Sequence, residues 1–104
     1  MTTATGCFAC TRITDEYHLK TDPQTFDDVA AGLKTFEIRF DDRGYGIGDV
    51  LTLERTVHSG AEMAAGAPLE YTGRRLDVRV QHKLTGYGLM PGWCVLSIKV
   101  LEPA

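Results

Sequence analysis

Charged side chains of both signs gather in the segment GLKTFEIRFDDRGYGIGD, which spans residues 32–49. Lys34, Glu37, Arg39 and Arg43 are its candidates for chemistry. An arginine guanidinium donates forked hydrogen bonds to a phosphate or carbonyl oxygen, and a carboxylate accepts from an exocyclic amine such as that of cytosine. We therefore expect Arg39 and Arg43 to hold an anionic or carbonyl oxygen, and Glu37 to hold an amine.

Lys34 is the reactive candidate of the segment. A lysine amine acts as a base only in its neutral form, which a nearby Arg39 would favour and a nearby Glu37 would oppose. If Lys34 activates water for amide hydrolysis, Glu37 can relay the proton and Arg39 can stabilise the oxyanion. The segment therefore permits either binding or hydrolysis.

The competing interpretation of this segment is an ordinary half-exposed strand, in which a surface pair of Glu37 and Arg39 contributes at most about 1 kcal/mol. Three basic and three acidic residues lie within residues 30–46, and so dense a neutral cluster suits one polar ligand better than a long polyanion. The alternation predicts a strand over 35–40 with Phe36, Ile38 and Phe40 facing the core and Thr35, Glu37 and Arg39 facing outward.

The elements that position this strand begin with a short strand over 17–21. A helix should follow it, with Thr21 or Asp22 as the cap, Pro23 at its first position and Gly32 as its left-handed stop. Its apolar face combines Phe26, Val29 and Ala30. Further strands are expected over 50–56, 76–84 and 93–101, and a small-residue loop over 58–68.

The last two strands should provide much of the core. We expect Leu76, Val78, Val80, His82 and Leu84 to point inward, with His82 as a hydrogen-bonded core histidine and Lys83 outward. Cys94, Leu96, Ile98 and Val100 form the core side of the final strand. About five strands and one helix, with no β-α-β alternation that would build a parallel sheet, predict a small, mainly β (α+β) and mostly antiparallel barrel with the helix packed on it.

Length and composition limit the class of protein to which the chain can belong. The 104 residues, 43% hydrophobic and 24% charged, suit one globular domain, which we place at 17–104 behind an N-terminal arm at 1–16. The sequence has no signal-peptide pattern and no apolar run long enough for a membrane span, so a cytoplasmic location is expected. Cys7 and Cys10 have the spacing of half a zinc site, but the other candidate ligands are scattered, so we expect neither metal nor cofactor.

Net charge argues against a protein that coats long nucleic acids, since the total is -3. Its distribution is uneven. Residues 1–70 carry six basic and twelve acidic side chains, whereas residues 71–104 carry five basic and two acidic ones. A local basic face that includes Arg74 can therefore coexist with a negative net charge of the whole chain.

Several short motifs together resemble the ASCH-like family of the PUA-like superfamily: H18-L-K20, G32-L-K34-T-F-E37-I-R39, D42-R43, G48-D49 and Y71-T-G-R74. The resemblance covers about residues 17–101. It implies a five- to six-stranded pseudo-barrel with a cleft beside the main helix, and the binding of RNA or a modified nucleoside. Lys34, Glu37 and Arg39 would lie at that cleft. Some similar proteins hydrolyse N4-acetylcytidine and others cleave RNA, but those amidohydrolases carry threonine where this chain has Glu37.

Three hypotheses of function follow. The first is a domain that binds RNA or a nucleoside in a charged cleft, and the second is a small hydrolase with Lys34 and Glu37 as its catalytic residues. The third is a protein-interaction module without chemistry. The expected ligand-binding residues, with Tyr45 and Tyr71 as aromatic stacking platforms, are His18, Lys20, Lys34, Glu37, Arg39, Arg43, Tyr45, Tyr71 and Arg74.

Overall fold

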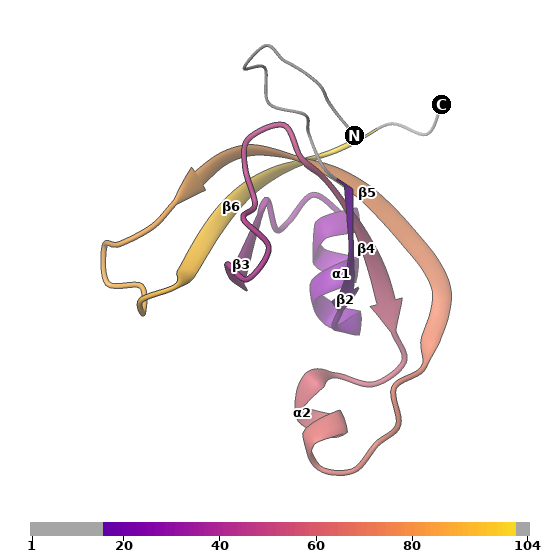
Figure 1. Cartoon of the computed structure of the whole chain (residues 1–104). Helices are drawn as coiled ribbons and strands as arrows, with labels where there is room; N and C mark the ends of the chain where they lie inside the picture. The colour runs from indigo at the N-terminus through magenta and orange to yellow at the C-terminus, as the bar shows by residue number, and fades with distance from the viewer. Residues whose placement is uncertain (1–15, 102–104) are drawn as a thin grey trace, which may run out of the picture.

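The computed structural model describes residues 16–101 and consists of one five-stranded mixed sheet curled into a half-barrel, with two short helices (Figure 1). The predicted mainly β fold is confirmed. The strands follow the order β2-β4-β5-β6-β3 across the sheet. The elements are β2 (Glu16–Thr21), α1 (Pro23–Ala30), β3 (Phe36–Phe40), β4 (Val50–Thr56), α2 (Gly60–Ala64), β5 (Tyr71–Leu84) and β6 (Trp93–Val100).

One pair of neighbouring strands is parallel, and the other three pairs are antiparallel. β2 and β4 run in the same direction because the chain crosses over through α1 and β3 before it returns beside β2. This crossover places β2 and β3 at the two edges of the sheet. Strand pairing therefore leaves the half-barrel open along one side.

The helix α1 lies within the curl of the sheet and buries Phe26 and Val29 in the core (Figure 1). Gly32 adopts the positive φ of 78° that turns the chain out of the helix, as the sequence predicts. Ala30 is exposed, so the apolar face is narrower than expected. The rest of the core comes from the concave face of the sheet and one loop residue: Leu19, Tyr45, Leu51, Leu53, Val78, Val80, Cys94, Leu96 and Ile98.

The predicted orientation of the 35–40 strand is wrong. Phe36, Ile38 and Phe40 are 41–51% exposed, whereas Glu37 is only 3% exposed. The cause is the pairing of β3 with β6, in which Glu37 lies opposite the buried Leu96. Residues that lie opposite each other in a sheet share a face, so the apolar row of β6 turns the charged row of β3 inward.

The predicted faces of β5 hold only up to Val80. The register with β6 shifts between Val80 and His82, and this irregularity inverts the alternation for the rest of the strand. His82 is exposed and not a core histidine, and Leu84 is also exposed. Lys83 is instead half-buried, and its ammonium donates a hydrogen bond to the carbonyl of Tyr45 over 2.8 Å.

Two segments extend from the half-barrel, namely the β5–β6 hairpin and residues 57–70, which we call the α2 arm (Figure 1). The sequence predicts a loop over 58–68, but the α2 arm contains the helix α2, which begins at the capping box formed by Ser59 and Glu62. Its link to the body includes a hydrogen bond from the Gly60 N–H to Asp22 Oδ1 over 3.0 Å. Asp22 stands at the N-cap of α1, but its side chain does not cap that helix.

None of the helices formed by residues 16–101 is long and apolar enough to cross a membrane. The predicted arm at 1–16, including Cys7 and Cys10, lies outside the described residues apart from residue 16, which begins β2.

Candidate functional site

The open side of the half-barrel is a seam between the edge strands β2 and β3 that side chains bridge. Arg39 on β3 donates from Nη2 to the backbone carbonyl of Lys20 on β2 over 3.1 Å. Near the other end of β2, the Tyr17 hydroxyl donates to the carbonyl of Arg43 over 3.2 Å. The first bond joins two strands that no ladder connects within residues 16–101, and the second joins β2 to the segment that follows β3.

A hollow of about 200 Å³ opens at this seam beside the start of α1. Pockets for drug-sized molecules are usually about 300–1,000 Å³, so this hollow has room for a single small ring or a comparable group. It is lined by Lys20, Thr21, Asp22, Thr25, Lys34, Glu37, Ile38 and Arg39.

Glu37 is the buried charged group of the hollow, with a side chain that is 3% exposed. Its Oε2 accepts a hydrogen bond from Arg39 Nε over 3.0 Å. Its Oε1 has no hydrogen-bond partner in the part of the chain that the structure describes, and Lys34 Nζ lies 3.8 Å away. An unpartnered buried oxygen costs free energy, about 1–3 kcal/mol or more for a charged group, so this atom is suited to a donor from a ligand.

The backbone of Ile38 adds a second polar group to the hollow. The Ile98 N–H donates to the Thr35 carbonyl over 3.0 Å, which makes these opposed residues a hydrogen-bonded pair. In an antiparallel ladder, hydrogen-bonded pairs alternate with pairs that are not hydrogen-bonded. Two and four residues after Thr35, the backbones of Glu37 and Arg39 therefore bond to β6, while the N–H and C=O of Ile38 point away from it. Ile38 therefore faces the hollow with its backbone and the outer surface with its side chain.

The charges around the hollow are mixed, as the sequence predicts. Lys20, Lys34 and Arg39 contribute three positive charges, and Asp22 and Glu37 contribute two negative ones. This balance favours a neutral or singly anionic ligand that also presents a hydrogen-bond donor.

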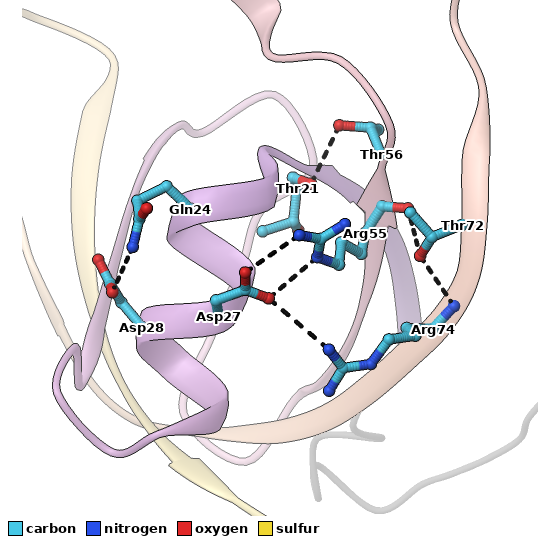
Figure 2. Close-up of polar contacts among 8 residues, drawn as sticks. All are labelled: Thr21, Gln24, Asp27, Asp28, Arg55, Thr56, Thr72 and Arg74. Atoms are coloured by element: carbon cyan, nitrogen blue, oxygen red, sulfur yellow. Dashed lines mark hydrogen bonds and ion pairs between the residues drawn. The ribbon is translucent and has the colours of Figure 1, made fainter.

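The helix that borders the hollow is held in place by a polar network on its other side (Figure 2). Arg55 on β4 donates from Nε and Nη2 to the two carboxylate oxygens of Asp27 over 2.9 and 3.0 Å. Arg74 on β5 lies 3.7 Å from the same carboxylate, and its guanidinium lies over the Phe26 ring. The hydrogen bond from Arg55 holds the pKa of Asp27 below its usual value.

Lys20, Lys34, Glu37 and Arg39 are the predicted site residues that the structure brings together. The other five do not line the hollow. His18 lies 4.0 Å from Glu54 and 3.2 Å from Arg75, Arg43 lies over the Tyr17 ring, and Arg74 contacts α1. Tyr71 is exposed at the start of β5.

Tyr45 offers no surface on which a base could stack, because it is 3% exposed and packs edge-on against Tyr17 in the core. Trp93 makes an edge-on contact with Phe40.

Four residues of the hollow were not predicted as ligand contacts. The sequence predicts Thr21 or Asp22 as the cap of the helix, and a cap residue lies at the start of α1, beside the hollow. Thr25 follows in the first turn of α1. Nothing in the sequence indicates Ile38 as a ligand contact, because it lines the hollow with its backbone. The direction of that backbone depends on which strand β3 pairs with.

A second hollow, of about 340 Å³, lies beneath the β5–β6 turn and includes Asp41, Gly92 and Trp93. Both carboxylate oxygens of Asp41 are already engaged, with the Tyr45 N–H at 3.0 Å and Lys83 Nζ at 2.5 Å. This carboxylate therefore lacks the unpartnered oxygen that distinguishes Glu37.

A protein-family model matches most of the chain. The model of a domain of unknown function, DUF3850, matches residues 16–98, which include every residue that lines the seam hollow. No curated protein matches the chain.

Proposed function

The chain belongs to the DUF3850 family, and we propose that it binds RNA or a modified nucleoside by receiving one base in the hollow at the β2–β3 seam. The resemblance of its G32-L-K34-T-F-E37-I-R39 and Y71-T-G-R74 motifs to ASCH-like domains of the PUA-like superfamily supports this proposal. The family description itself assigns no function.

The observation that carries the proposal is the unpartnered Oε1 of Glu37, buried at the hollow. An exocyclic amine supplies the donor that this oxygen lacks, and a base such as cytosine has ring acceptors beside its amine. The backbone N–H of Ile38 can donate to such an acceptor. Lys34 can contact a carbonyl or phosphate oxygen of the same ligand.

The size of the hollow suits one base and leaves the sugar and phosphate outside. A binding mode of this kind engages few phosphates, so affinity for short RNA should fall only shallowly as salt rises. Because Tyr45 is buried, hydrogen bonding to Glu37 replaces aromatic stacking as the main source of selectivity in this proposal.

A second candidate function is hydrolysis of an acylated exocyclic amine, favoured by the 3.8 Å separation of Lys34 Nζ and Glu37 Oε1. A water or an amide nitrogen could contact both groups across that gap. Water would add to the acyl carbon, the carbon–nitrogen bond would break, and a proton would pass to the leaving amine. The products would be a carboxylic acid and the free amine.

Binding is tested by titrating the full chain with cytidine, N4-acetylcytidine, uridine and short single-stranded RNAs, followed by NMR. We expect shifts at Glu37 and Ile38 with ligands that carry an N–H at this position, and weaker shifts with uridine. Glu37→Gln keeps the shape of the side chain but presents an amide, so affinity should fall at least about tenfold. Glu54→Gln, on the outer face of the sheet, is the matched control.

No shift around the hollow with any of these ligands would contradict the proposal, as would equal losses in Glu37→Gln and Glu54→Gln. Hydrolysis is tested in the same samples by detecting free cytidine. Lys34→Ala should abolish turnover and keep the melting temperature, whereas Lys99→Ala should change neither. Binding without turnover by the unmodified chain would leave binding as the function and exclude hydrolysis of that substrate.

A further inference from the structure

We propose that the outer face of β3 and β6, with the end of β5, is the interface of a homodimer in which two copies of this chain pack face to face. This surface lies on the other side of the sheet from the core. The side chains of Glu37 and Arg39 point inward to the hollow, whereas the two surfaces adjoin at Ile38, whose backbone lines the hollow, and at Phe36, whose ring centroid lies 5.2 Å from Lys34 Nζ.

The register of three neighbouring strands arranges apolar side chains in rows across this face. Ile38 lies opposite Val95, which lies opposite Leu84 on the next strand. In the adjacent row Phe40 lies opposite Trp93, and on the other side of the central row Phe36 is opposite Ser97. Opposed residues share a face, so these side chains form one patch that no single-strand pattern reveals.

The exposed area of the patch approaches the apolar area that a dimer interface buries. Phe36, Ile38, Phe40, Leu84 and Trp93 are between 37% and 51% exposed. Taking about 200 Å² for each such residue when fully exposed, these fractions amount to about 430 Å² of apolar surface, a patch size that commonly marks an interaction site. A standard interface buries about 800 Å² per partner, rather more than half of it apolar. The patch thus supplies most of the apolar share of such an interface.

Part of the patch is already packed against neighbouring residues. The Phe40 ring lies so close to Gly92 that a Cβ there would be 2.7 Å from Phe40 Cε1, and its centroid is 5.9 Å from that of Trp93. Side chains that are held before association lose less conformational freedom when they are covered.

The composition of the rows favours a second copy of the chain over other occupants. The three rows contain no charged side chain, and their polar members are Ser97 and His82. Two identical faces related by a two-fold axis can therefore meet without burying an unpaired charge. The next row on this face pairs Arg79 with Lys99, and these exposed cations lie outside the three apolar rows.

Edge-to-edge pairing of β3 with another chain is less suitable than face-to-face packing. The free edge of β3 borders the seam, where Arg39 already reaches across to Lys20. A second strand at that edge would displace this bond and fill the hollow. The face formed by the outward side chains of β3 is free of this conflict.

The test is the mass of the full chain in solution, measured by sedimentation equilibrium from micromolar to millimolar concentration. We expect a concentration-dependent shift to twice the monomer mass. Ile38→Lys places a charge at the centre of the patch and should weaken dimerisation at least about tenfold. Leu69→Lys is the control, because Leu69 is similarly exposed at 47% but lies outside the patch. Leu84→Lys tests the same surface from another strand, should Ile38→Lys disturb folding.

Circular dichroism and the melting temperature of each variant separate loss of the interface from loss of the fold. A monomer at every concentration overturns the proposal, as does a dimer that both patch variants leave intact. A monomer that instead sediments with lipid vesicles also overturns it and assigns the patch to membranes. Ligand binding by a monomeric chain would leave the proposed function standing without the dimer.

Discussion

The guanidinium of Arg39 donates to the backbone carbonyl of Lys20 over 3.1 Å and thereby joins the two edge strands of the sheet. The same side chain holds Glu37 through its Nε. One residue therefore bridges the half-barrel and orients the buried carboxylate of the candidate site. Covering an edge in this way also protects unpaired backbone groups from association with other chains.

Removing this bridge should cost the chain considerable stability. Arg39→Met keeps much of the side-chain volume but leaves Glu37 with Lys34, 3.8 Å away, as the nearest cation. Because one partner of a largely buried ion pair is lost, we expect the free energy of unfolding to fall by about 2–3 kcal/mol. Urea denaturation measures this change.

The control for Arg39→Met is Arg79→Met, an exposed position on β5. A double variant with Glu37→Gln should lose less than the sum of the two single changes, because the second change removes the charge that the first leaves unpaired. Additive losses, or equal losses in Arg39→Met and Arg79→Met, would show that the bridge does not contribute in this way.

Acid should weaken the contact between β5 and the segment after β3. The hydrogen bond from Lys83 holds the pKa of Asp41 below its usual value, and the Tyr45 N–H adds to this effect. A carboxyl whose folded pKa lies below the unfolded value of about 3.9 stabilises the fold fully above that value. This contribution is lost as the pH falls through the lower folded pKa.

Asp41→Asn should therefore be less stable than the unmodified chain at neutral pH, and the two stabilities should converge below about pH 4. Urea denaturation over a series of pH values measures the difference. Asp42→Asn, at the exposed neighbouring position, is the control variant. A difference for Asp41→Asn that stays the same down to the acid limit would argue against the ion pair.

Two glycines of the β5–β6 turn should respond differently to alanine. Gly86 and Gly92 both have positive φ, at 77° and 86°. A Cβ at Gly86 meets nothing within 4 Å, whereas at Gly92 it would lie 2.7 Å from Phe40 Cε1. We expect Gly86→Ala to cost about 1 kcal/mol of backbone strain and Gly92→Ala about 1–3 kcal/mol more from the contact.

The single tryptophan reports on that contact, because Trp93 packs against Phe40. Its fluorescence should change in Gly92→Ala, where the Phe40 ring must move, and stay unchanged in Gly86→Ala. Adding Phe40→Leu to Gly92→Ala should recover part of the lost stability. Equal destabilisation of the two alanine variants would contradict the contact.

The Cys94 thiol should be protected from alkylation in the folded chain. Cys94 is fully buried, and this burial raises the pKa of its thiol. Because the thiolate is the reactive form, iodoacetamide should label Cys94 only after unfolding. Mass spectrometry of the peptide that contains Cys94 measures the labelling, with Thr85→Cys as an exposed control. Rapid labelling in native buffer would contradict the buried position.

Local residue types determined much of the framework. Pro23 and Gly32 mark the limits within which α1 forms, and the apolar alternation of β6 indicates its buried face correctly from Cys94 to Ile98. These features depend on dihedral preferences and on periodicity within one element, so the sequence alone contains them.

The direction of the β3 side chains was decided only by tertiary structure. Its apolar and charged rows both alternate with period two, and alternation alone does not say which row faces the core when the strand lies at a seam. Because Glu37 lies opposite the buried Leu96, the charged row faces inward and the apolar row faces outward, the reverse of what hydrophobicity predicts. The register shift after Val80 acted similarly on His82, because a single irregularity inverts every later residue of a strand.

The candidate site combines these two sources. The sequence indicated Lys34, Glu37 and Arg39 as a group, since they lie within six residues of one another. Their meeting with Lys20 and Asp22 depends on the curl of the sheet, which brings the edges β2 and β3 together although they are not paired. Long-range strand order is a property of the whole chain, so no local pattern could place the two edges on either side of one hollow.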